Sequence, residues 1–100
     1  MTADEKVELK TEMLLSQSEG LFTDRLNELV FDMIEDHTNR LNEKLKYRIE
    51  ENNLNDIKKE ALVSCNVMGL NFKPERLTNA FIYMSLVIRC SIARNLKKLK

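Results

Sequence analysis

The sequence predicts an all-α protein: a four-helix, bundle-like domain with a long second helix and a long, largely buried C-terminal helix. Two glycines and one proline in 100 residues are too few turn-forming residues for a β-sandwich or barrel, which reverses direction about every 8 to 12 residues. Apolar residues instead recur at spacings of three and four along four segments, as in helices with one buried face. With 43% apolar residues, such a chain can bury enough surface to offset the entropy lost on folding.

The first helix is expected over residues 3–17. Thr2 and Glu5 form a T-x-x-E capping box, in which each side chain accepts a hydrogen bond from a backbone amide at the helix start. Gly20 interrupts the pattern, and Thr23 then caps the next helix. The apolar face of this segment is thin and consists of Val7, Met13, Leu14 and Leu15. We therefore interpret the chain as a single domain whose first 20 residues form a loosely attached helix.

The second helix is expected to run from Asp24 to about Asn52, because the stretch ENNLND then supplies three Asn and one Asp, which favour turns over helix interiors. An apolar stripe follows this segment. It comprises Leu26, Leu29, Val30, Met33, Ile34, His37, Leu41, Leu45 and Ile49. Acidic residues on the opposite side form a candidate surface for a basic partner: Asp24, Glu28, Asp32 and Glu35.

The third helix is expected from Asp56 to Met68, with Asn55 as its N-cap and Gly69 in the left-handed conformation that ends many helices. Cys65 lies on its expected inner face, with Ile57, Ala61, Leu62 and Met68.

The fourth helix is expected from Pro74 to about Leu99, because proline suits the first helical position, and Phe72 can pack on Leu77 at its start. Its apolar stripe is Leu77, Phe81, Met84, Ile88, Ile92, Leu96 and Leu99. Further apolar residues surround the stripe, so this helix is either the centre of the bundle or a subunit interface. We expect self-association through Phe81, Tyr83, Met84, Val87 and Ile88.

Charge is unevenly distributed along the chain. Residues 1–36 carry ten acids and three bases, a net charge of −7, whereas residues 37–100 carry six acids and thirteen bases, a net charge of +7. The two halves can neutralise each other within one chain, pair between two copies, or bind other charged macromolecules.

The stretch FDMIEDH places carboxylates beside an imidazole, which raises the hypothesis of a metal or acid–base site at Asp32, Glu35, Asp36 and His37. Helical metal enzymes need a second set of ligands from a facing helix, and the sequence offers none. A metal-dependent helical hydrolase is therefore a distant alternative. His37 lies on the apolar side of its helix, where burial would keep it neutral and protonation would loosen a contact.

Nucleic-acid binding is the main alternative. The C-terminal segment carries basic residues that could contact nucleic-acid phosphates: Arg89, Arg94, Lys97 and Lys98. Residues 55–85 can also be interpreted as a helix-turn-helix, with a recognition helix that begins with Glu75, Arg76, Thr78, Asn79 and Tyr83. The apolar middle of that helix argues against this interpretation, because a recognition helix presents a polar face to the groove.

The sequence also bears on compartment. The stretch AFIYMSLVI is the most apolar run, and its nine residues are too short to span a membrane. Cys65 and Cys90 lie in apolar helical patterns without a C-x-x-C pair, as reduced structural cysteines do. The N-terminus alternates charges where a signal peptide needs an apolar run. We expect a cytoplasmic protein; frequent Asn, Lys and Ile are typical of AT-rich coding, as in some phages.

Catalytic motifs are not evident: the sequence has no Gly-rich phosphate loop, G-x-S-x-G or H-E-x-x-H motif. We therefore expect a small helical regulatory or assembly protein, not an enzyme, that acts by protein–protein binding as a homodimer. We expect it to use no cofactor or metal.

Overall fold

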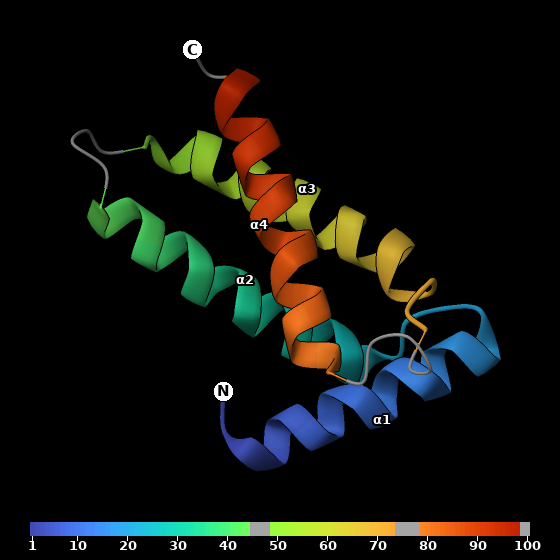
Figure 1. Cartoon of the computed structure of the whole chain (residues 1–100). Helices are drawn as coiled ribbons and strands as arrows, with labels where there is room; N and C mark the ends of the chain where they lie inside the picture. Colours follow the sequence, from blue (N-terminus) through green and yellow to red (C-terminus); the bar gives the residue numbers. More distant parts are fainter. Residues whose placement is uncertain (45–48, 74–78, 99–100) are drawn as a thin grey trace.

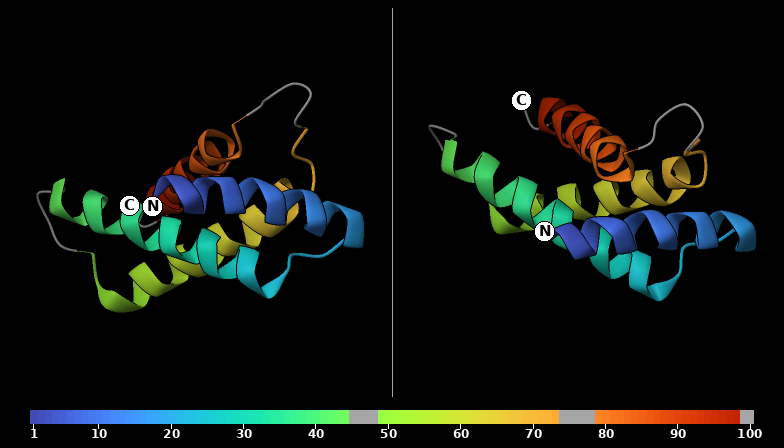
Figure 2. Two further views of the ribbon diagram at one scale, coloured as in Figure 1. Left: turned by 90° about the horizontal axis from the view of Figure 1, so that it is seen from below. Right: turned by 60° about the horizontal axis from the view of Figure 1, so that its bottom comes forward.

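The computed structural model describes residues 1–44, 49–73 and 79–98, and these form four helices and no strand. The helices are α1 (Ala3–Glu19), α2 (Asp24–Lys44), α3 (Glu51–Gly69) and α4 (Ala80–Lys98). α1 lies along one end of the bundle beside α2, and α4 lies across α2 and α3 (Figure 1). A second view shows α4 as a layer over these two helices (Figure 2). The predicted all-α, bundle-like fold is confirmed.

The core draws on all four helices. α4 packs most closely against α3 and less closely against α1 and α2. The largest fully buried apolar side chains are Leu9, Met13, Leu26, Leu29, Val30, Ile34, Met84 and Ile88. Burial of each such side chain contributes about 1.5–3 kcal/mol relative to exposure. Because Met84 and Ile88 lie in this core, α4 is a core helix of its own chain.

The start of α1 confirms the predicted capping box. The Glu5 amide donates to Thr2 Oγ1 at 3.2 Å, and the Thr2 amide donates to Glu5 Oε1 at 3.1 Å. Gly20 ends the helix with a φ of 77°, a left-handed conformation that glycine adopts without steric cost. The predicted apolar face is wrong except at Met13. The inner face is Leu9, Met13 and Ser16, while Val7, Leu14 and Leu15 are exposed.

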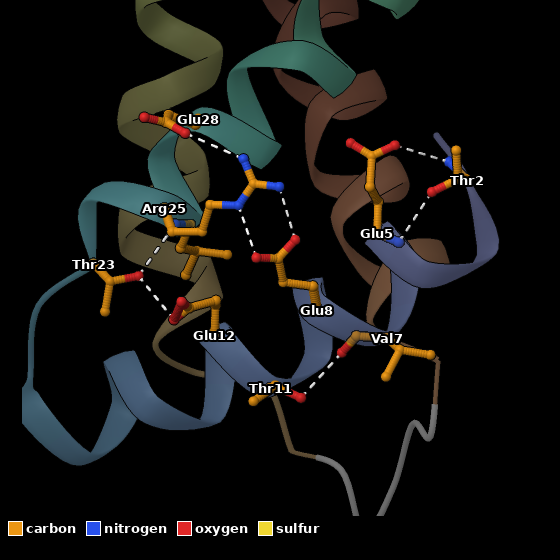
Figure 3. A network of polar contacts seen from close by, with 10 residues as sticks. Thr2, Glu5, Val7, Glu8, Thr11, Glu12, Thr23, Arg25 and Glu28 are labelled. Carbon is orange, nitrogen blue, oxygen red and sulfur yellow. Dashed lines mark hydrogen bonds and ion pairs between the residues drawn. The ribbon is translucent and has the colours of Figure 1, made fainter.

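A polar network holds α1 against α2 (Figure 3). The Arg25 guanidinium donates from Nε and Nη2 to both Glu8 carboxylate oxygens, at 2.8 and 2.7 Å, and pairs with Glu28 at 3.2 Å. The hydrogen bond to Arg25 lowers the pKa of Glu8. Thr23 Oγ1 accepts from the Leu26 amide at 3.1 Å, which confirms the predicted cap. The pair of hydrogen bonds between Arg25 and Glu8 fixes the orientation of α1 more than it adds stability, because both of these side chains are partly exposed.

The boundary between the second and third helices is predicted wrongly. α2 ends at Lys44, and α3 begins at Glu51, with Glu50 at the N-cap position. The stretch ENNLND is therefore the first part of α3, and Asn55 lies inside the helix. Ile57 is buried and Leu54 packs on the core, so tertiary packing outweighs the weak helix propensity of the three Asn residues. Leu45 lies outside the described residues.

The end of α3 differs from the prediction as well. Gly69 is the last helical residue and is not left-handed, since Gly20 is the only described glycine with positive φ. A Cβ atom at Gly69 would overlap the Phe22 ring, so the absence of a side chain here allows close packing. Phe72 is buried against Tyr83, with ring centroids 5.2 Å apart. The predicted helix start at Pro74 and the Phe72–Leu77 contact involve residues 74–78, which lie outside the described ranges.

Candidate functional site

A strongly apolar groove lies between α3 and α4. Its volume is about 570 Å³, in the range of about 300–1,000 Å³ that ligand sites occupy. α3 supplies Val63, Ser64, Val67 and Met68, and α4 supplies Tyr83, Leu86, Val87, Cys90 and Arg94. We call this depression the α3/α4 groove. Spacings of three and four residues place each set along one side of its helix.

Large apolar side chains stand exposed on both walls of the α3/α4 groove. Val63 and Val67 are each 59% exposed, Leu86 is 49% exposed and Met68 is 43% exposed. Ile82, one turn before Leu86 on α4, is 54% exposed. Single exposed apolar residues are common on proteins, whereas a contiguous group of them marks an interaction surface.

Hydrogen bonds between the two helices fix the shape of the groove. The Tyr83 hydroxyl donates to the Met68 carbonyl at 2.7 Å, near the end where the chain leaves α3. The Ser64 and Ser91 hydroxyls lie 3.3 Å apart, and Arg94 donates to Ser64 at 3.3 Å. The walls are thus joined at both ends, by Tyr83 with Met68 and by Ser64 with Ser91 and Arg94, so the groove is preformed and loses little entropy on binding.

The predicted self-association face is divided by the fold. Tyr83 and Val87 line the α3/α4 groove, whereas Met84 and Ile88 are fully buried inside the chain and cannot contact a partner. Phe81 lies on another side of α4, with the Lys6 ammonium 4.4 Å from its ring centroid. The prediction that Met84 and Ile88 take part in self-association is therefore wrong. Prediction from the sequence missed the α3 wall, although Val63 and Val67 lie off the predicted inner face of their helix.

The two cysteines differ, against the prediction that both are structural. Cys65 is fully buried, and this burial raises the pKa of its thiol to about 12. Cys90 is exposed on the wall of the α3/α4 groove. The α4 pattern is apolar on most sides, so the pattern alone does not distinguish its buried residues from those of the groove. Cys90 gives the groove a native chemical reporter.

The predicted acidic surface lies on α2. Asp24, Glu28 and Asp32 are exposed, and Glu35 is half-buried. Of these four acidic residues, Glu28 forms an ion pair within the described residues, and its partner is Arg25. The described ion pairs are Arg25 with Glu8 and Glu28, and Arg40 with Asp36. Only the last joins the acidic and basic halves of the sequence, so the described chain does not neutralise its charge asymmetry through many direct contacts.

The predicted nucleic-acid contacts are exposed but do not form one stripe. Arg94, Lys97 and Lys98 share one side of α4, while Arg89 lies on the opposite flank. In the helix-turn-helix interpretation, Asn79 and Tyr83 belong to the exposed start of the recognition helix. The Asn79 side chain accepts from the Ile82 amide at 3.1 Å as a helix cap, and the Tyr83 hydroxyl is bonded to α3. Glu75, Arg76 and Thr78 lie outside the described residues.

The acidic stretch near His37 does not assemble a metal site. Within residues 1–44, 49–73 and 79–98, no group of three or more His, Cys, Asp and Glu side chains could hold a metal ion. His37 is half-buried between α2 and α4, and its pKa is lowered mainly by that burial. None of the described helices has the length and apolarity needed to cross a membrane.

Comparison with known proteins adds no relative: no protein-family model, curated protein or solved structure matches the chain. The surfaces that the fold creates are therefore the guide to function. Two of them flank α4. One is the α3/α4 groove, and the other is a cleft between α2 and α4 with a different chemistry.

Proposed function

We propose that this protein acts by protein–protein binding through the α3/α4 groove, as a regulatory or assembly protein that forms a homodimer. The observation that supports the proposal most is the exposure of Val63 and Val67 opposite Leu86, across a groove closed by interhelical hydrogen bonds. Covering such a surface removes apolar area from water, at about 25 cal/mol per Å². A preformed groove lined by Met and aromatic residues suits a helical partner surface.

A second copy of the chain is the partner we favour. A two-fold axis places the same groove on both molecules, so that Val63 and Val67 on the rim of one copy pack on the α4 wall of the other. Arg94 is the one charged residue in the lining of the groove, and it lies at one end. The central part therefore brings no like charges together when two copies meet.

The test is the absolute mass of the protein by light scattering, with Val67→Glu and Val7→Glu as matched variants. Both valines are exposed on helices, at 59% and 69%, so neither substitution disturbs the core. We expect a dimer that Val67→Glu converts to a monomer and that Val7→Glu leaves intact. A monomer in the unsubstituted protein, or a dimer that only Val7→Glu dissociates, would contradict self-association through the groove.

Cys90 provides a second measurement that needs no substitution. We expect its reaction with a thiol reagent to slow as protein concentration rises through the dimerisation range, because the partner covers the groove. The Val67→Glu variant should react at one rate at all concentrations. A dimer in which Cys90 stays fully reactive would place the interface elsewhere.

Nucleic-acid binding is the second candidate, favoured by the exposure of Arg94, Lys97 and Lys98 on one side of the last turns of α4. Phosphate contacts of this kind make affinity fall steeply with salt. We expect binding to duplex DNA, if this candidate holds, to weaken in the double variant Lys97→Gln, Lys98→Gln. Dimerisation should persist in that variant, so the two functions are separable.

A further inference from the structure

The cleft between α2 and α4 is independent of the proposed protein interface. It lies on the opposite flank of α4 from the α3/α4 groove and has a volume of about 490 Å³. We call it the α2/α4 cleft. α2 contributes His37, Arg40, Leu41 and Lys44, and α4 contributes Phe81, Ser85, Arg89, Ile92, Ala93 and Leu96. Both sets follow helical spacing, so each helix presents one continuous side to the cleft.

The cleft combines an apolar floor with a cationic rim. Ile92 is buried, and Leu41 and Leu96 are half-buried, so these residues form the floor. Three cations, Arg40, Lys44 and Arg89, are exposed around them, and no carboxylate is among the described residues of the lining. Arg40 pairs with Asp36, which lies outside the lining. Lys44 and Arg89 form no ion pair with any residue in the described part of the chain.

The electrostatics of His37 agree with an excess of positive charge. Burial lowers the pKa of this imidazole first, Arg40 and Arg89 lower it further, and Asp36 opposes them. His37 also borders a smaller depression toward α1, whose charged lining is Glu5, Lys6, Asp32, Asp36, Arg40 and the amino group of Met1. The carboxylates therefore gather on the α1 side, whereas the α4 side of His37 carries Lys44 and Arg89, which have no ion-pair partner among the described residues.

We propose that the α2/α4 cleft binds a small organic anion with an apolar body, such as a medium-chain carboxylate or alkyl phosphate. The anionic head would lie against Arg89 and Lys44, and the apolar body would cover the floor around Ile92. An inorganic anion would leave the floor exposed to water, and an apolar cation would meet three like charges. Sites for small ligands commonly join an apolar surface with a few polar groups of this kind.

The binding experiment uses the full chain and four probes followed by calorimetry. Decanoate and decyl phosphate carry the same body with two different anionic heads, decyltrimethylammonium carries the same body with a cationic head, and acetate lacks the body. All are used below their micelle concentrations, with far-UV circular dichroism to confirm that the fold persists. We expect saturable one-to-one binding of the two anionic amphiphiles, about tenfold or more tighter than that of the cationic probe, and none of acetate.

Matched variants locate the site. Arg89→Gln removes a cation from the α2/α4 cleft, whereas Arg94→Gln removes the same residue type from the other flank of α4. Since a charge-assisted contact at an exposed site is worth about a factor of three to ten in affinity, we expect decanoate binding to weaken by that factor in Arg89→Gln alone. Decyl phosphate binds tighter than decanoate if the head is a phosphate, and weaker if it is a carboxylate.

Three results would overturn the proposal. Equal binding of decanoate and decyltrimethylammonium would mean that only apolar surface is recognised. An equal or greater loss in Arg94→Gln would place the ligand in the α3/α4 groove. The absence of saturable binding by both anionic amphiphiles would remove the site altogether. None of these outcomes depends on the oligomeric state, so the homodimer proposal stands or falls separately.

Discussion

The two flanks of α4 differ in chemistry although one helix builds both. The flank toward α3 carries an apolar groove joined by hydrogen bonds, and the flank toward α2 carries a cleft with three cations above an apolar floor. The neighbouring helix makes the difference: α3 contributes Val63 and Val67, whereas α2 contributes Arg40 and Lys44. A helix that is apolar on most sides can therefore serve a core and two distinct surfaces.

The largest expected contrast is between the two thiols, which report the buried and exposed sides of the α3–α4 pair. Cys65 reacts only when the core opens, and a domain of this size is stabilised by about 5 kcal/mol or more. We expect Cys65 to react with a thiol reagent more than about a thousandfold more slowly than Cys90. The measurement is a stopped-flow time course at low protein concentration, where the groove is uncovered.

The control for the thiol experiment is Cys90→Ser, which should remove the fast phase and leave one thiol that reacts slowly in buffer and rapidly in denaturant. Two fast thiols in the unsubstituted protein would mean that α3 does not protect its inner face. The contrast between core and groove would then be lost.

The next effect compares Ile88 and Leu86, two residues apart on α4. Ile88 is fully buried and Leu86 is 49% exposed. We expect Ile88→Ala to lower the free energy of unfolding by about 2–5 kcal/mol through loss of packing and a cavity. Leu86→Ala should change it by about 0.5 kcal/mol or less. Urea denaturation at low protein concentration measures both, and similar losses would show that Leu86 belongs to the core.

The sequence predicts this fold well where the signals are local. The Thr2–Glu5 capping box and the apolar stripe of α2 depend on residues within a turn or two; the capping box is confirmed, and the stripe is confirmed from Leu26 to Ile34. The predicted end of the stripe is wrong at Ile49, which is buried but lies outside α2. The predictions are wrong where contacts with distant segments of the chain determine the local structure. The role of Gly69 depends on the Phe22 ring, which approaches from another part of the chain, and ENNLND is helical because Ile57 anchors α3 in the core.

The candidate surfaces were harder to predict for the same reason. Whether Val63 faces the core or solvent depends on the angle at which α3 crosses α4, and the apolar periodicity of one helix does not reveal that angle. The α2/α4 cleft takes cations from two helices that are far apart in the sequence, so Arg40 and Arg89 line one depression only when the helices pack. Arg89 and Arg94 are close along the chain, so the sequence alone predicts one shared surface for them.

A smaller effect tests the link between the groove walls. Tyr83→Phe removes the hydroxyl that donates to the Met68 carbonyl, and we expect a loss of about 0.5–1.5 kcal/mol in unfolding free energy. The control is Thr11→Val, which removes an exposed hydroxyl bonded to the Val7 carbonyl within α1 and should cost less. If both variants match the unsubstituted protein, this bond does not hold the groove closed.

The smallest expected effect is a pH dependence on the α2 flank. The pKa of His37 is lowered from an ordinary value near 6.5, first by burial and then by Arg40, with Arg89 adding to the shift and Asp36 opposing it. In the unfolded chain His37 takes up a proton near pH 6.5, whereas in the folded chain it does so at lower pH. The unfolded state therefore binds more protons between these two values, and stability must fall as the pH decreases through that window.

We expect the urea midpoint to decrease as the pH falls from 7.5 to 5.5, and His37→Gln to flatten this dependence. The carboxyls whose pKa is lowered, including Glu8 and Asp36, lose their contributions only at more acidic pH, so they do not obscure the window. A midpoint that rises on acidification would mean that carboxylates around His37 outweigh its burial and the nearby arginines. The positive character of the α2/α4 cleft would then be wrong, while the α3/α4 groove, which contains no histidine, would be unaffected.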